Sequence, residues 1–114
     1  MHVTDEEFEQ LVEEAVARIP KRFAAHLENV GFQVMEQARP EQGHLLGLYE
    51  GIPLPARNGA YSGVLPDVIT IYKQPHERLA GSFEQLREEV RHTVWHEVAH
   101  YFGLGHERIR ALEE

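Results

Sequence analysis

Cysteine is absent from this 114-residue chain, which excludes disulfides, zinc–thiolate fingers, thiol catalysis and iron–sulfur clusters. No apolar run approaches the roughly 20 residues of a membrane-spanning helix, and the acidic start lacks the basic and apolar parts of a secretory signal. Basic residues are few: 11 Lys plus Arg stand against 19 Asp plus Glu, a formal charge of −8. A broad surface for nucleic acid or anionic lipid is therefore disfavoured, and we expect a cytoplasmic protein.

What the chain does contain is enough apolar material for one core. Hydrophobic residues make up 42% of the sequence, and domains typically run to about 100–150 residues, so we expect residues 1–114 to form a single domain. Eight histidines are many for this length. These histidines are therefore the first candidates for functional residues.

Helix signals open the sequence. Thr4 is followed three residues later by Glu7, the pattern of a capping box, and apolar residues then recur at helical spacing as far as Ile19. Pro20 ends this helix and suits the first turn of a short second one. Gly31 is predicted to follow the end of that second helix.

The middle of the chain is predicted to be extended. Strands are expected at Phe32–Gln37, at Leu45–Tyr49 and at Val68–Tyr72, the last being entirely β-branched or aromatic. Between the second and third strands, the turn-forming residues of Gly51–Pro66 predict a long irregular loop.

A long helix is predicted next, and it places the fold in the α+β class. Ser82 and Gln85 form its capping signal, and Gly103 is a natural stop. Its apolar stripe consists of Phe83, Leu86, Val90, Val94, Val98 and Phe102. A short final helix is expected from about His106 onward.

The long helix carries the motif HEVAHYFGLGH, residues 96–106. His96 and His100 are four residues apart, so their side chains are neighbours on one helix face and can hold one ion. Two residues advance a helix by about 200°, so this face points away from the apolar stripe at Val94 and Val98. One helix can therefore contribute to the core and to a metal site.

The rest of the motif completes an open zinc site. Glu97 is placed to reach a water on the metal, and glycines at 103 and 105 allow a sharp bend that returns His106 to the ion. Three histidine nitrogens and one water are the ligands of a catalytic zinc. The five-residue core would arise by chance in about one such chain in ten, but the extended spacing in roughly one in two thousand.

This extended spacing is the metzincin signature. Together with YSGVLPDVITIY (61–72), LLGLYEG (45–51) and VWHEVAHYFGLGHERIRAL (94–112), it resembles a family of small bacterial zincin-like metallopeptidases over nearly the whole chain. The resemblance implies a minimal zincin fold, in which a small mixed sheet packs with an N-terminal helix and a long active-site helix. It also implies Zn²⁺ as cofactor and a peptide or protein as substrate.

The chain departs from the metzincin pattern in two places. Metzincins have a methionine turn after the third ligand, whereas Met1 and Met35 both precede the motif. Many relatives hold an acidic residue in place of His106, which makes Glu107 the substitute third ligand.

In the mechanism that this motif predicts, Glu97 is the general base that activates water. Tyr61 is a candidate donor to the tetrahedral oxyanion, and a peptide could add to an exposed sheet edge as a further strand. His92 continues the stripe of His96 and His100, but three such residues span about 12 Å, too far for one ion. The remaining histidines, His2, His26, His44 and His76, are expected at the surface.

Two other functions compete with the peptidase. One is a three-histidine metal-dependent endoribonuclease of the rRNA-maturation kind, for which Arg57, Arg78, Arg87 and Arg91 could form a local basic groove. That family typically lacks a glutamate after the first histidine, so Glu97 argues against it. The other is a non-catalytic module whose metal is structural, which would show a fourth coordination position closed by protein.

Overall fold

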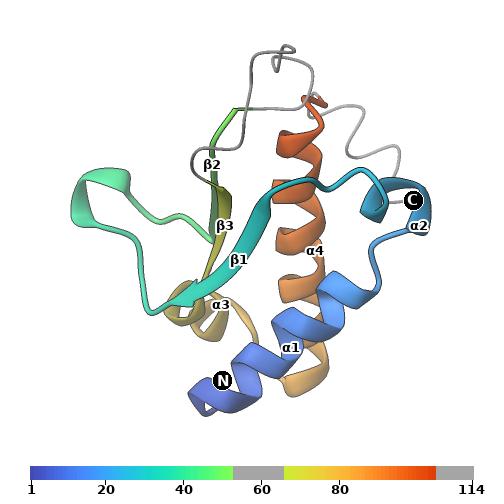
Figure 1. Cartoon of the computed structure of the whole chain (residues 1–114). Coiled ribbons are helices and arrows are strands. Elements are labelled where there is room, and N and C mark those ends of the chain that lie inside the picture. Colours follow the sequence, from blue (N-terminus) through green and yellow to red (C-terminus); the bar gives the residue numbers. More distant parts are fainter. Residues whose placement is uncertain (53–65, 105–114) are drawn as a thin grey trace.

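The computed structural model describes residues 1–52 and 66–104 of the chain. Helices and strands alternate irregularly, as the α+β prediction required, and three strands form one mixed sheet (Figure 1). In chain order the elements are α1 (Asp5–Ala17), α2 (Lys21–Ala24), β1 (Val30–Met35), the 3₁₀ helix η1 (Pro40–Gln42), β2 (Gly47–Glu50), β3 (Asp67–Tyr72), α3 (Lys73–Leu79) and α4 (Phe83–Tyr101).

The sheet has the order β1-β3-β2, with β3 in the centre. β1 runs parallel to β3, and β2 runs antiparallel to it. Ile69 and Ile71 of β3 are completely buried, because the helices α1 and α4 lie against the same side of the sheet (Figure 1). β2 is an edge strand that contacts α4, and this contact positions the site described below.

The N-terminal helix α1 follows the prediction closely. The Thr4 side chain accepts a hydrogen bond from the backbone of Glu7, and the Glu7 side chain accepts one from the backbone of Thr4. The buried residues Phe8, Leu11, Val12 and Ala15 form the face that packs against α4. The helix ends at Ala17, two residues before Ile19, which is nevertheless buried in the core.

The long helix α4 is also confirmed. The Ser82 side chain accepts a hydrogen bond from the backbone of Gln85, and Gly103 takes the left-handed conformation (φ 72°) just beyond the last turn. The predicted apolar stripe is buried at Leu86, Val90, Val94 and Val98. Within the described segments, no helix combines the length and apolar character needed to cross a bilayer.

Several predicted boundaries were wrong. Gly31 lies inside β1 rather than after a helix, so this strand starts at Val30 and ends two residues before Gln37. The second strand starts at Gly47 instead of Leu45. Glycine is a weak strand former, but tertiary pairing with β3 overrides that preference at both positions. The predicted final helix from His106 lies outside the described residues.

The short helix α3 was not predicted. Its Pro75 lies in the first turn, where the missing N–H would have no partner in any case, but seven residues give too little periodicity to indicate a helix. α3 contains His76, whose predicted surface location is wrong because its side chain is fully buried. A ring protonated at Nδ1 donates to the Tyr72 carbonyl at 2.6 Å, while Nε2 lies 2.8 Å from Thr93 Oγ1. Burial lowers the pKa of His76 below 6.5.

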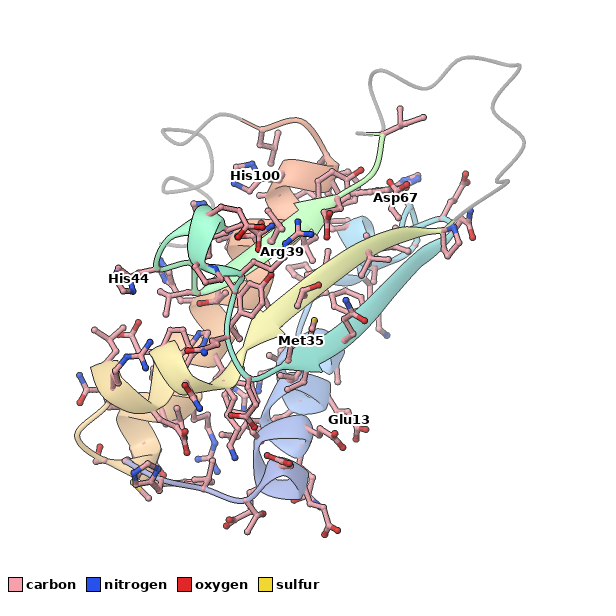
Figure 2. The ribbon with its side chains drawn as sticks, turned by 90° about the vertical axis from the view of Figure 1, so that its left-hand side faces the viewer. Glu13, Met35, Arg39, His44, Asp67 and His100 are labelled. Atoms are coloured by element: carbon pink, nitrogen blue, oxygen red, sulfur yellow. The ribbon has the colours of Figure 1, made fainter. Side chains whose placement is uncertain are left out.

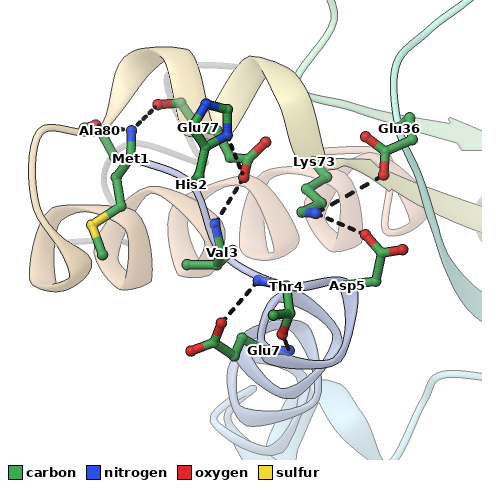
Figure 3. A network of polar contacts seen from close by, with 10 residues as sticks. All are labelled: Met1, His2, Val3, Thr4, Asp5, Glu7, Glu36, Lys73, Glu77 and Ala80. Carbon is green, nitrogen blue, oxygen red and sulfur yellow. Dashed lines mark hydrogen bonds and ion pairs between the residues drawn. The ribbon is translucent and has the colours of Figure 1, made fainter.

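Polar contacts tie the start of the chain to α3 (Figure 3). The Met1 amino group donates to the carbonyl oxygens of Glu77 and Ala80, at 2.7 and 3.0 Å. Lys73 Nζ pairs with the Asp5 carboxylate at 2.7 Å, which lowers the pKa of Asp5. These contacts fix the first turn of α1 against the helix that packs on α4.

Candidate metal centre

The last two turns of α4 bring two imidazoles and a carboxylate together. His96, Glu97 and His100 each offer a ligand atom, and these atoms all lie within 4.8 Å of one another. The two imidazole rings are 4.8 Å apart between centroids and inclined by 72°. Both histidines are half-buried, and Figure 2 shows His100 near the C-terminal end of α4.

The helix separates this cluster from the core. Val94 and Val98 have at most 1% of their surface exposed, whereas the side chains of His96 and His100 remain partly accessible. The about 200° advance of two residues accounts for the division. Ring nitrogens held close together on a partly accessible helix face can bind one cation.

Glu97 is the most buried member of the cluster, with 8% of its surface exposed. Burial raises the pKa of its carboxyl group to about 7, opposed by a hydrogen bond from the backbone of Tyr49. No ion pair among the described residues involves Glu97. A cation beside this group would favour its ionised form, and two imidazole nitrogens with a nearby carboxylate oxygen form a donor set that suits zinc.

Close approach of β2 to α4 depends on Gly47. A Cβ atom at this position would lie 2.8 Å from Thr93 Cγ2 and 3.1 Å from Glu97 Cγ. Both distances are shorter than ordinary van der Waals contact. The absence of a side chain therefore lets the edge strand pass directly against the helix turn that bears Glu97.

We expect Gly47→Ala to lower the free energy of unfolding by about 1–3 kcal/mol, the usual cost of overpacking. The methyl group would force β2 and α4 apart, so zinc affinity should fall as well. Thermal denaturation and zinc titration measure the two effects. Gly31→Ala is the matched control, because its Cβ would meet nothing nearer than the Asp67 carbonyl at 4.0 Å. Equal effects of the two substitutions would contradict the close approach.

Tyr49, which contacts Glu97 through its backbone, is itself held from two directions. Its hydroxyl lies 2.5 Å from Asp67 Oδ2, and Asp67 is buried, with only 2% of its surface exposed. Its ring meets Tyr101 edge-on at a centroid distance of 6.1 Å. The Tyr101 hydroxyl in turn donates to the His26 carbonyl at 3.1 Å.

Sequence reasoning missed Tyr49 and Asp67 as supports of the site. An aspartate just before an apolar strand is ordinarily solvated, and its partner is 18 residues away in sequence. The available signal was indirect. Tyr49 lies in the segment LLGLYEG and Asp67 in the segment YSGVLPDVITIY, and both segments carry the resemblance to the zincin-like family.

The other residues predicted for the site lie outside the described residues or outside the cluster. His106, Glu107 and Tyr61 lie outside the described residues. His92 is exposed on α4, one turn before His96. Among the expected surface histidines, His2, His26 and His44 are exposed.

Of the four arginines considered for a basic groove, three lie in the described part of the chain, and two of these form ion pairs with glutamates. Arg78 lies on α3, whereas Arg87 and Arg91 lie on α4. Arg87 pairs with Glu84 at 3.1 Å, and Arg91 pairs with Glu88 at 2.7 Å. Arg57 is outside the described residues.

Comparison with known proteins matches the chain to a family and to a solved structure. A family model described as "zincin-like metallopeptidase" matches residues 26–114. The fold is similar to a solved structure, a conserved hypothetical protein from "Thermo thermophilus", with a TM-score of 0.61 and 29% sequence identity. The similarity covers 97% of this chain and 100% of that one. No curated protein matches.

Proposed function

Because the chain belongs to the zincin-like metallopeptidase family, we propose that it hydrolyses peptide bonds with zinc held by His96 and His100. His106 is the proposed third ligand, with Glu107 as the substitute. The observation that supports this proposal is the cluster at the end of α4, where a buried carboxylate lies within 4.8 Å of two imidazole nitrogens.

The residues present fit such an ion. The cluster offers neutral nitrogen donors on a half-accessible face, and the carboxyl of Glu97 lacks a cationic partner among the described ion pairs. When bound, zinc supplies a Lewis acid that polarises the scissile carbonyl and makes a water molecule more acidic.

Glu97 is the proposed proton carrier. As the water oxygen bonds to the carbonyl carbon, the Glu97 carboxylate takes one water proton, and it then delivers that proton to the leaving nitrogen as the C–N bond breaks. The backbone of Tyr49 restrains the carboxylate by a hydrogen bond. The Asp67–Tyr49 contact keeps this donor in place.

The edge strand β2 is the proposed binding surface for an extended peptide. Among the described strands it pairs with β3 alone, and Figure 2 shows β2, β3 and β1 side by side in front of α4. A peptide that adds as a strand uses main-chain hydrogen bonds and so is recognised largely independently of its side chains. β2 also touches α4 at Glu97, so such a peptide would run beside the cluster.

The test is hydrolysis of an unfolded protein by the full chain, followed by mass spectrometry of the fragments. Activity should disappear after treatment with a chelator and return with added zinc, because a three-ligand site exchanges its metal. Fragments that form equally fast in chelated protein would contradict the proposal. Zinc uptake without any cleavage would favour the non-catalytic metal module instead.

A further inference from the structure

A cavity lies beside α4, on a different face of the helix from the histidine cluster. It has a volume of about 210 Å³ and lies between the end of α1, the start of α2 and the middle of α4. Ile19, Phe23 and Trp95 form its apolar lining. We call it the arginine pocket, because Arg18, Arg22 and Arg91 also line it.

The arginine pocket is basic in an acidic protein. Its three arginines and one glutamate, Glu88, give a formal charge of +2, against −8 for the whole chain. Arg91 pairs with Glu88 at 2.7 Å. The contact between Arg18 and Glu14 is long at 4.0 Å.

Arg22 has no carboxylate partner among the described ion pairs. Its guanidinium instead lies 5.0 Å from the centroid of the Phe23 ring. An arginine in this arrangement keeps its donors available for a planar oxyanion such as a carboxylate. The charge of the pocket thus favours an anionic ligand.

The indole of Trp95 forms part of the wall of the pocket. Its Nε1 atom is buried and has no hydrogen-bond partner in the described structure, although a buried donor ordinarily has one. The Trp95 ring is fixed by an edge-on contact with Phe23, at a centroid distance of 5.1 Å. Because the Nε1 atom is shielded from solvent, a ligand in the pocket meets the aromatic ring of Trp95 rather than its N–H group.

The size of the pocket limits what can enter it. Sites for drug-sized ligands typically measure about 300–1,000 Å³, so 210 Å³ is too small for a nucleotide. It is large enough for one short side chain or a chain end. The fit is therefore to a carboxylate carried by a larger molecule that remains mostly outside.

The pocket adjoins the proposed catalytic cluster through His92. This residue lines the pocket and lies one turn before His96. From the midpoint of His96 and His100, it is about 9 Å away along the axis at 1.5 Å per residue. The residues of α4 that line the pocket and those of the cluster face different sides of the helix, so a bound peptide also has to pass around α4, which adds to this axial distance.

We propose that the arginine pocket is a specificity site that binds a carboxylate of the peptide substrate at a distance from the scissile bond. The carboxylate belongs to an aspartate or glutamate side chain or to the C-terminus of the substrate. This inference rests on the proposed peptidase function. It predicts that the enzyme prefers acidic peptides despite its own net negative charge.

The test uses Trp95, the single tryptophan of the chain, as a fluorescent reporter of the pocket. Hexapeptides containing one glutamate are titrated into the full-length protein with chelator present, so that binding is measured without cleavage. The glutamate peptide should bind roughly tenfold or more tightly than its glutamine counterpart, as expected for a charge-assisted hydrogen bond. Peptides with C-terminal acid or amide groups distinguish the two sources of carboxylate.

Substitutions locate the effect. Arg22→Met and, as a second variant, Arg91→Met should each remove most of the preference for glutamate over glutamine. Arg78→Met removes the same charge from an exposed position on α3 and should leave the preference intact. Circular dichroism shows that each variant is folded.

Three results would overturn the inference: equal binding of the glutamate and glutamine peptides, an equal loss in Arg78→Met, or fluorescence changes with inorganic phosphate but not with acidic peptides. A different result would contradict the peptidase proposal alone. In that case the glutamate peptide would still bind in an Arg22-dependent way, but zinc-loaded protein would not cleave it.

Discussion

Glu97→Gln is expected to lower the rate of peptide hydrolysis by about 100-fold or more while zinc remains bound. Positioned general acid–base groups typically contribute about 10²–10⁴-fold, and glutamine cannot carry the proton from water to the leaving amine. The amide has the same shape as the carboxylate, so the packing against Gly47 and the backbone of Tyr49 should persist. Steady-state cleavage of a peptide and elemental analysis of the purified variant measure the two quantities.

Glu89→Gln is the matched control for this substitution. Glu89 also lies on α4 and is half-buried, but it is two turns before Glu97 and outside the cluster. The Glu89→Gln variant should cleave the peptide at the wild-type rate. Full activity in Glu97→Gln would remove the proposed proton carrier and with it the mechanism.

His96→Ala and His100→Ala should each weaken zinc binding by more than about 100-fold. Loss of an outer partner of a metal ligand already costs about 10–100-fold, and loss of the ligand itself should cost more. The remaining imidazole cannot compensate, because the two rings are the only histidines within the described cluster. Competition with a chromophoric chelator gives the affinities.

His44→Ala is the control for general effects of removing an imidazole. His44 is exposed and lies between η1 and β2, away from α4 in sequence. The affinity of the His44→Ala variant for zinc should match that of the wild type. Unchanged binding in both His96→Ala and His100→Ala would refute the ligand assignment.

The long helix could be predicted almost completely from the sequence. Its cap at Ser82, its stop near Gly103 and the pairing of His96 with His100 all depend on residues at most four positions apart. Local rules of capping and helical spacing apply directly at that range. The α+β class and the zincin-like fold are also confirmed, since the resemblance rests on this motif together with the segments 45–51 and 61–72.

Strand boundaries were harder because they are set by partners distant in sequence. Gly31 was predicted to follow a helix, yet it pairs with Val68 of β3, and Gly47, predicted inside a strand, is the first residue of β2 and pairs with Ile71. Gly47 has a further reason to be glycine, since α4 passes too close for a side chain. That packing reason cannot be seen without the structure.

Buried polar residues could not be predicted for the same reason, because their partners are distant in sequence. His76 was predicted at the surface and Asp67 was given no role, because isolated polar residues are usually solvated. Their partners, Thr93 and Tyr49, are 17 and 18 residues away. Only the fold brings each pair together, and only then is the cost of burial offset by a hydrogen bond.

Anomalous X-ray diffraction at the zinc edge, on crystals of the native protein, tests most directly whether the two imidazoles bind zinc in an open site. We expect one peak at about 2.0–2.1 Å from a ring nitrogen of both His96 and His100, the usual zinc–histidine distance, with one coordination position not filled by protein. A peak bound by neither ring, or a site closed by four protein ligands, would contradict the account.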